Sequence, residues 1–228
     1  MKLPRLYPII DASFSPDLHS ILAAAEQLVN SGCTLLQYRN KSDNPRLMLQ
    51  QARELRRLFP RSENPHFFQN QGEVGHPRSA ICEDPDSVCL IMNDRADLCL
   101  GADFDGVHVG QDDLSPESVR AIVGPHRWLG VSTHNPEQLR EADLTSANYL
   151  AIGPVFATSS KQNPDPVVGL EGVRRARALT RKPLVAIGGI TRANAASVIE
   201  AGADSVAVIS DLVREPGKSA EEFFRILR

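Results

Sequence analysis

Polar and charged side chains recur in this chain directly after short apolar runs. The segment 37–41 reads Gln-Tyr-Arg-Asn-Lys and stands at the end of one such run. Alternate residues of a strand point the same way, so we expect Gln37, Arg39 and Lys41 to converge on one side. The planar fork of arginine and the point charge of lysine suit a polyanionic ligand such as a phosphate. The alternative is that these strand-end side chains are solvated or pair with Asp and Glu.

Carboxylates follow the next two apolar runs. Asp94 comes after Asn93, and Asp113 closes the segment Gly-Gln-Asp-Asp at 110–113. Beside a cationic strip they indicate a hard divalent cation, because Mg²⁺ takes one or two carboxylates together with phosphate oxygens and water. Helix N-capping is the alternative for both carboxylates, and it is the better explanation for Asp112.

Hydroxyl groups and glycines occupy the ends of the later runs. Ser132 can bind a polar ligand atom or cap a helix. A run of three hydroxyls and a lysine at 158–161 forms an anion cradle or a polar loop. The pair Gly188-Gly189 lets backbone N–H groups approach a phosphate closely, unless it is only a tight turn. Ile209 and Ser210 can add an N–H and a hydroxyl.

The apolar runs themselves predict the strands that would position these groups. Most are apolar throughout rather than alternating, as expected of strands that are covered on both faces in a parallel sheet. The predicted strands are Tyr7–Ile10, Thr34–Tyr38, Val88–Met92, Gly106–Val109, Trp128–Val131, Tyr149–Ile152, Leu184–Ile187 and Ser205–Ile209. The predicted helices between and after them are Asp17–Val29, Asn44–Phe59, Arg95–Leu100, Ser115–Val123, Asn135–Leu144, Leu170–Leu179, Arg192–Ala201 and Ser219–Leu227.

Strands that alternate with helices in this way form either an open doubly wound sheet or a closed (β/α)₈ barrel. The segment 185–190, Val-Ala-Ile-Gly-Gly-Ile, favours the barrel, since barrels often bind phosphate at the loops after strands 7 and 8. We therefore predict one α/β domain over residues 1–228, a (β/α)₈ TIM barrel. The polar segment 60–86, with four prolines, is predicted to be a long insertion between helix 2 and strand 3. It is either a surface loop or an interaction patch.

Composition excludes several classes of protein. The chain has 228 residues, 42% of them hydrophobic and 23% charged, which rules out a wholly disordered protein. A net charge of −3 gives no basic excess for nucleic acid or an acidic membrane surface. Membrane spans and a signal peptide are not expected. The four cysteines form no Cys-x-x-Cys pair, so we expect reduced thiols in a cytoplasmic protein.

Read in order, the motifs of the chain closely resemble those of the thiamine-phosphate synthase family. The resemblance covers nearly the whole chain outside 60–86. It implies a (β/α)₈ fold and a transferase that requires Mg²⁺. The implied substrates are 4-amino-2-methyl-5-hydroxymethylpyrimidine diphosphate and 4-methyl-5-(2-phosphoethyl)thiazole, and the products are thiamine phosphate and pyrophosphate. The matching segments are YPIID, LLQYRNK, IMNDRADL, DGVHVGQDDL, LGVSTH, IGPVFATSSK, VAIGGI and AGADSVAVIS.

The resemblance also assigns roles to individual residues. It implies Mg²⁺ at Asp94 and Asp113, and stabilisation of the leaving group by Arg39, Lys41 and Lys161. It suggests a homo-oligomer and a dissociative substitution at the pyrimidine methylene carbon. The implied contacts to the pyrimidine diphosphate are Gln37, Tyr38, Arg39, Asn40, Lys41, Asn93, Ser132 and Lys161. The implied contacts to the thiazole phosphate are Thr158, Ser159, Ser160, Gly189, Ile209 and Ser210.

Three departures from the family pattern are visible. Ser160 stands where many relatives carry threonine, Asn40 replaces a frequent aspartate, and the segment 60–86 is inserted. Two other functions compete with the synthase. A related thiazole tautomerase would keep the phosphate site after strands 7 and 8 but would not need the diphosphate and metal cluster. A non-catalytic phosphate-ligand-binding barrel would use the same fold without turnover.

Overall fold

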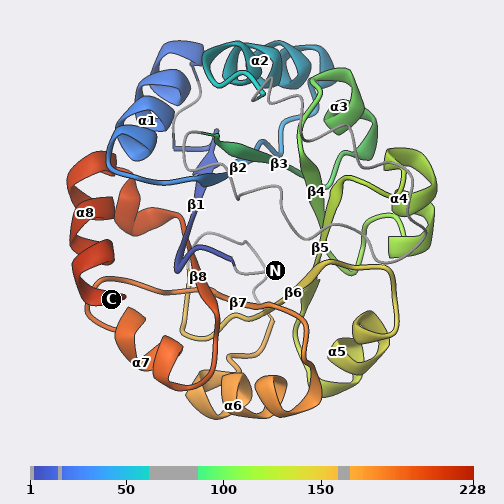
Figure 1. The fold of residues 1–228 in the computed structure, drawn as a ribbon, viewed down its shortest axis with the longest axis vertical. Helices are drawn as coiled ribbons and strands as arrows, with labels where there is room; N and C mark the ends of the chain where they lie inside the picture. The colour runs from blue at the N-terminus through green and yellow to red at the C-terminus, as the bar shows by residue number, and fades with distance from the viewer. Residues whose placement is uncertain (1–2, 15–16, 62–86, 159–164) are drawn as a thin grey trace.

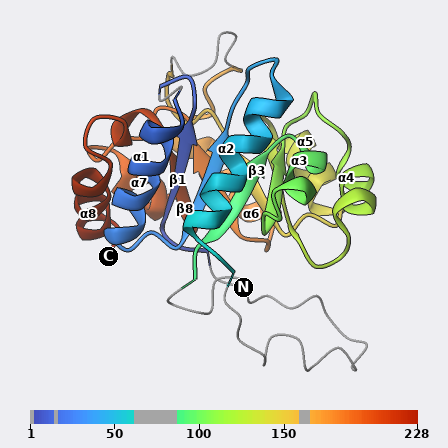
Figure 2. The ribbon, with the colours of Figure 1, turned by 90° about the horizontal axis from the view of Figure 1, so that it is seen from above.

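The protein is a closed barrel of parallel strands wrapped by helices. The computed structural model describes residues 3–14, 17–61, 87–158 and 165–228. Eight strands pair in chain order from β1 to β8, and β8 pairs back with β1 to close the barrel. The helices form a ring outside the strands when the molecule is viewed along the barrel (Figure 1) and flank the strands in the turned view (Figure 2). The predicted (β/α)₈ fold is confirmed, and the open sheet is excluded.

Strands lie where the apolar runs predict them, and three of them keep the predicted bounds. The others gain or lose one or two residues at their ends. The strands are β1 Leu6–Asp11, β2 Leu35–Arg39, β3 Cys89–Asn93, β4 Gly106–Val109, β5 Trp128–Thr133, β6 Tyr149–Ile152, β7 Leu184–Ile187 and β8 Ser205–Val208.

Helices begin where polar side chains can cap them. Asp17, Asn44, Ser115 and Asn135 each accept a hydrogen bond from the backbone N–H three residues further on, which satisfies one of the free donors of the first turn. Three of these helices carry proline at the first turn. The helices are α1 Leu18–Asn30, α2 Pro45–Leu58, α3 Ala96–Gly101, α4 Pro116–Val123, α5 Pro136–Asp143, α6 Gly169–Leu179, α7 Ala195–Glu200 and α8 Pro216–Ile226, with a 3₁₀ helix at Ser210–Leu212.

Most helix ends lie within one residue of the sequence prediction, but two helices begin further away for local reasons. Helix α7 begins after Asn194 rather than at Arg192, because the Asn194 side chain accepts the N–H of Thr191 at 2.8 Å and holds a turn there. Helix α8 begins at Pro216, whose fixed φ suits a first helical position. Of the predicted insertion 60–86, only residues 60 and 61 belong to the described part of the chain.

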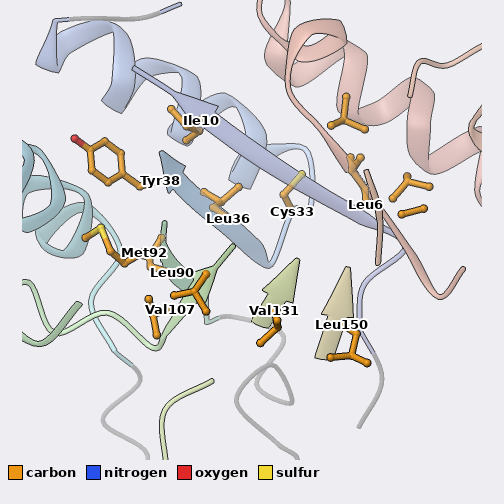
Figure 3. Packing of buried hydrophobic residues seen from close by; sticks show 14 of the residues in the cluster. Leu6, Ile10, Cys33, Leu36, Tyr38, Leu90, Met92, Val107, Val131 and Leu150 are labelled. Atoms are coloured by element: carbon orange, nitrogen blue, oxygen red, sulfur yellow. The ribbon is translucent and has the colours of Figure 1, made fainter. Parts of the chain in front are cut away.

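The core has two layers, because successive strand residues point to opposite faces of the barrel wall. On β2, Leu36 and Tyr38 face outward into the layer under the helices, whereas Leu35 faces inward. Figure 3 shows part of the outer layer, with Leu36 of β2 between Tyr38 and Cys33. The inner layer fills the barrel with Leu3, Tyr7, Ile9, Leu35, Cys89, Ile91, Trp128, Tyr149, Ala151, Val185 and Ala207.

Within the described ranges, no helix is both long enough and apolar enough to span a membrane.

Candidate active site

The carboxyl ends of the first three strands carry two ion pairs. Asp11 and Arg39 are partners in the register of β1 and β2, and the Arg39 guanidinium contacts the Asp11 carboxylate. The Asp11 side chain is only 1% exposed, so Arg39 balances a buried charge. Lys41 pairs with Asp94 after β3, and its side chain remains 56% exposed. Both cations of the 37–41 segment thus lie at one end of the barrel, and both pair with carboxylates.

Asp94 and Asp113 lie together at this end. The Asp94 N–H donates to the carbonyl of His108 at 2.7 Å, and Asp94 adopts a left-handed backbone with φ 61°. The Asp113 carboxylate accepts the N–H of Gly110 at 2.7 Å. Burial raises the pKa of Asp113, and the charge of Asp94 raises it further, whereas Lys41 opposes the shift. The two predicted carboxylates therefore share one patch of negative charge.

This patch fits a hard divalent cation. Its possible metal ligands are carboxylate oxygens, and the ammonium group of Lys41 already pairs with one of these carboxylates. The described residues contain no cluster of three or more His, Cys, Asp or Glu side chains that could hold a metal ion. Mg²⁺ suits such an incomplete shell, since it keeps water and substrate oxygens beside one or two carboxylates.

Asn93 offers a hydrogen-bond donor beside the acidic pair. Its amide nitrogen Nδ2 is buried and has no hydrogen-bond partner among the described residues. Such a group costs about 1–3 kcal/mol if nothing accepts its hydrogens. A ligand oxygen at this position would remove that cost, as the predicted role of Asn93 requires.

A chain of hydrogen bonds crosses the barrel interior. Gln37 Nε2 donates to Tyr7 Oη at 3.0 Å, and Tyr7 Oη lies 2.9 Å from Tyr149 Oη. Tyr149 Oη lies 3.0 Å from His108 Nδ1, and His108 Nε2 lies 2.8 Å from Ser132 Oγ. We call these five residues the tyrosine–histidine chain. Burial lowers the pKa of His108 to about 4, so its ring is neutral at pH 7.

Three members of this chain were missed by the sequence reasoning. Tyr7, His108 and Tyr149 lie inside apolar strands, so the sequence pattern indicates core residues at these positions. A signal was nevertheless present, because each is a hydrogen-bonding side chain within a short buried strand. Strand parity places Tyr7 on the inner face with Ile9, but only the closed barrel brings it to Tyr149.

Two residues of the 37–41 segment point elsewhere. Tyr38 lies on the outer face of β2, and its hydroxyl donates to Gln51 of α2 at 2.5 Å. Asn40 is buried beside it and donates to Gln51 at 3.0 Å. Figure 3 shows Tyr38 on the side of its strand toward the helix layer. The side chains of Tyr38 and Asn40 are therefore not brought to the same place as Arg39 and Lys41.

The glycine pair after β7 packs against the loop after β6. Gly189 has φ 63°, and a Cβ there would lie 2.5 Å from the carbonyl oxygen of Ala157 and 2.8 Å from Cβ of Phe156. Only glycine fits at this position, so the backbone after β7 lies directly against the loop after β6. Ile209 is half-buried and Ser210 is exposed at the start of the 3₁₀ helix.

The loop after β6 is described up to Thr158, which is half-buried. Ser159, Ser160 and Lys161 lie outside the described residues. Of the predicted anion cradle at 158–161, the structure therefore places only Thr158. Thr158 directly follows Phe156 and Ala157, the residues that Gly189 packs against.

Cations, neighbouring carboxylates and a glycine turn after β7 at the carboxyl ends of a (β/α)₈ barrel are typical of an enzyme that handles phosphorylated small molecules. The sequence profile described as thiamine monophosphate synthase matches residues 73–212. The chain belongs to the thiamine monophosphate synthase family and is a transferase that makes thiamine phosphate.

Individual relatives agree over most of their length. A thiamine-phosphate synthase of Koribacter versatilis is 54% identical over 230 residues, covering 100% of this chain and 97% of the relative. The thiamine-phosphate synthase of Chloroflexus aurantiacus is 40% identical, covering 92% and 85%. The solved thiamine phosphate pyrophosphorylase of Pyrococcus furiosus superposes with a TM-score of 0.76 at 31% identity, covering 98% and 95%. The resemblance read from the motifs is confirmed.

Proposed function

We propose that the chain transfers a pyrimidinylmethyl group from its diphosphate to the nitrogen of a thiazole phosphate. The substrates are those that the sequence resemblance implies, and the products are thiamine phosphate and pyrophosphate. The observation that supports this most is the cluster of Lys41, Asp94 and Asp113, with Arg39 on the neighbouring strand. A diphosphate needs both the cations and a metal held by the carboxylates.

Asp94 and Asp113 would hold Mg²⁺ through their carboxylate oxygens. When bound, Mg²⁺ would neutralise charge on the leaving diphosphate. Lys41 is exposed enough to leave Asp94 and contact a diphosphate oxygen once the carboxylates face a metal. Asn93 would donate its unpartnered amide hydrogens to the same ligand.

Bond breaking precedes bond making in this proposal. The bond between the methylene carbon and the diphosphate oxygen breaks, and its electron pair leaves with the diphosphate. The electron-rich aminopyrimidine stabilises the resulting cation. The lone pair of the thiazole nitrogen then forms the new carbon–nitrogen bond. Neither step needs a protein nucleophile or a general base, so Arg39 and Lys41 act on the charge of the leaving group.

The thiazole phosphate would occupy the other side of the barrel mouth. Gly189 would supply a backbone N–H, and Ser210 with the N–H of Ile209 would add donors, as backbone groups do in other phosphate sites. Thr158, Ser159 and Ser160 would complete this contact. Holding both substrates on one rigid rim supplies proximity, which is the main requirement of a reaction between two bound molecules.

Other properties of the protein are proposed with the reaction. The described cysteines Cys33, Cys89 and Cys99 are buried, and the reduced thiols of Cys33 and Cys99 suit the reducing cytoplasm. Association into a homo-oligomer, suggested by the family, is testable by light scattering.

Reconstitution tests the proposed reaction. Purified protein receives both substrates with and without Mg²⁺, and chromatography detects thiamine phosphate and pyrophosphate. Formation of both products only with Mg²⁺ supports the proposal. Isomerisation of the thiazole phosphate without joining would indicate a tautomerase instead. Tight ligand binding without turnover would indicate a non-catalytic barrel.

Lys161→Ala extends the test to the leaving group. Loss of a cation that contacts the diphosphate should lower turnover strongly, by about 100-fold or more. Lys218→Ala is the matched control, because Lys218 is an exposed lysine of α8 that pairs with Glu215. Near-normal turnover of Lys161→Ala would remove this residue from the mechanism.

A further inference from the structure

The tyrosine–histidine chain joins two residues that the sequence resemblance assigns to the pyrimidine diphosphate, the substrate of the proposed function. Gln37 forms one end and Ser132 the other, and the links between them measure 2.8–3.0 Å. The two tyrosines are each only 1% exposed. Five side chains from five different strands are thus connected through the interior of the barrel.

The surrounding packing fixes Tyr149 at the centre of this chain. Its ring centroid lies 5.5 Å from that of His108, 6.1 Å from Tyr7 and 6.2 Å from Trp128. A Cβ at Gly130 would lie 2.1 Å from Cζ of Tyr149 and 2.4 Å from Nδ1 of His108. Strand β5 therefore has no side chain at the position that the contact between Tyr149 and His108 occupies.

Each hydroxyl has one hydrogen, and two orders of donors are self-consistent along the links of this chain. In the first direction Gln37 donates to Tyr7, Tyr7 to Tyr149, and Tyr149 to Nδ1 of His108. The imidazole proton then lies on Nε2 and is donated to Ser132 Oγ. In the reverse direction Ser132 donates to His108, and the Gln37 amide oxygen accepts from Tyr7.

The two directions present different groups to a ligand. The first leaves the hydroxyl hydrogen of Ser132 and the amide oxygen of Gln37 available. The reverse leaves a lone pair on Ser132 and the amide hydrogens of Gln37. Diphosphate oxygens only accept hydrogen bonds, whereas the amino group of the pyrimidine donates. The first direction gives Ser132 a hydrogen for the diphosphate and Gln37 an acceptor for the amino group, whereas the reverse leaves Ser132 with no hydrogen to donate to the diphosphate.

We propose that Tyr149 is a positioning residue that sets this direction, so that Ser132 donates to the diphosphate and Gln37 accepts from the pyrimidine amino group. This inference rests on the proposed function. Tyr149 does not touch the reacting atoms; it acts through the tautomer of His108. Tyr7 extends the same direction to Gln37, because it accepts from the Gln37 amide and donates to Tyr149.

Nitrogen-15 NMR of His108 tests the proposal independently of turnover. In the wild-type protein the ring should be neutral with its proton on Nε2, assigned by the signals lost in His108→Asn. In Tyr149→Phe, which removes the donor to Nδ1, both tautomers should appear. Thr133→Val is the control, since it removes a buried hydroxyl that donates to the Ala151 carbonyl at 2.8 Å outside the chain. A wild-type proton on Nδ1 would overturn the proposal.

Kinetics supply the second readout. Tyr149→Phe and Ser132→Ala should each lower kcat/KM for the pyrimidine diphosphate by about 10- to 100-fold, as expected for one charge-assisted hydrogen bond. The double variant should lose little more than either single variant, because both changes remove the same contact. Multiplicative losses would show that Tyr149 acts separately from Ser132 and would overturn the proposal.

Two further observations keep the result interpretable. If Tyr149→Phe does not fold, Tyr7→Phe is the alternative variant, because it interrupts the next hydrogen bond of the chain. Part of His108 should then carry its proton on Nδ1. An unchanged tautomer in Tyr7→Phe would contradict the proposed order. If the wild-type protein makes no thiamine phosphate, the proposed function fails, whereas a normal wild type with an unaffected Tyr149→Phe rejects only this inference.

Discussion

Replacing Gly130 by alanine tests how tightly the barrel interior is packed. The added Cβ would lie 2.1 Å from Cζ and 2.4 Å from Oη of Tyr149, and 2.4 Å from Nδ1 of His108. Both rings are buried, so either they separate or strand β5 shifts. Overpacking costs about 1–3 kcal/mol, and loss of a buried hydrogen bond costs a similar amount. We expect Gly130→Ala to lower the free energy of unfolding by about 2–6 kcal/mol.

Urea unfolding measures this loss directly. The single tryptophan, Trp128, belongs to the inner core and packs against Tyr149, so its fluorescence reports on this layer. Gly101→Ala is the matched control, because its Cβ would meet only the end of the Leu49 side chain at 3.0 Å. That variant should stay within about 1 kcal/mol of the wild type. If Gly130→Ala unfolds at the same urea concentration as Gly101→Ala, the packing argument is wrong.

Three further predictions address the metal site, the thiols and the phosphate side. Asp94→Asn should raise the Mg²⁺ concentration that gives half the maximal rate by about tenfold or more, equivalent to about 1.4 kcal/mol of binding free energy. The exposed Asp112→Asn is the control and should leave this concentration unchanged. Equal shifts in the two variants would contradict the assignment of Asp94 to the metal. Burial raises the pKa of Cys33 and of Cys99 to about 12, so neither thiol should be alkylated in native protein at pH 8, as mass spectrometry of tryptic peptides can check. Gly189→Ala should raise KM for the thiazole phosphate more than KM for the pyrimidine diphosphate, because its Cβ would meet the carbonyl oxygen of Ala157 at 2.5 Å; an equal effect on both would argue against this location.

Much of the fold follows from the sequence because each strand is a short apolar run followed by polar residues. Strand β6 at Tyr149–Ile152 and strand β7 at Leu184–Ile187 have the bounds that their apolar residues predict. The ends of the helices were harder to predict, because they depend on side-chain contacts that residue type alone does not specify. The hydrogen bond between the Asn194 side chain and the Thr191 N–H is one such contact.

The candidate site was predictable in its charges and less so in its geometry. Strand parity correctly separated Gln37 and Arg39 from Tyr38, but the family pattern grouped all of them. Asp11 went unnoticed because its role appears only once β1 and β2 lie side by side. The contact of Tyr7 with Tyr149 joins residues 142 positions apart in the sequence, a separation that local patterns do not bridge.

The seam between β1 and β8 has a consequence for the newly made chain. The Val206 N–H donates to the Arg5 carbonyl at 2.8 Å, and the Arg5 side chain reaches the Asp204 carbonyl across 199 positions of sequence. On the ribosome, β1 emerges long before β8 and must wait with one edge unpaired. Unpaired strand edges are prone to pair with other chains. Synthesis therefore includes a period in which the open edge of β1 can pair with other chains, and closure of the seam ends that period.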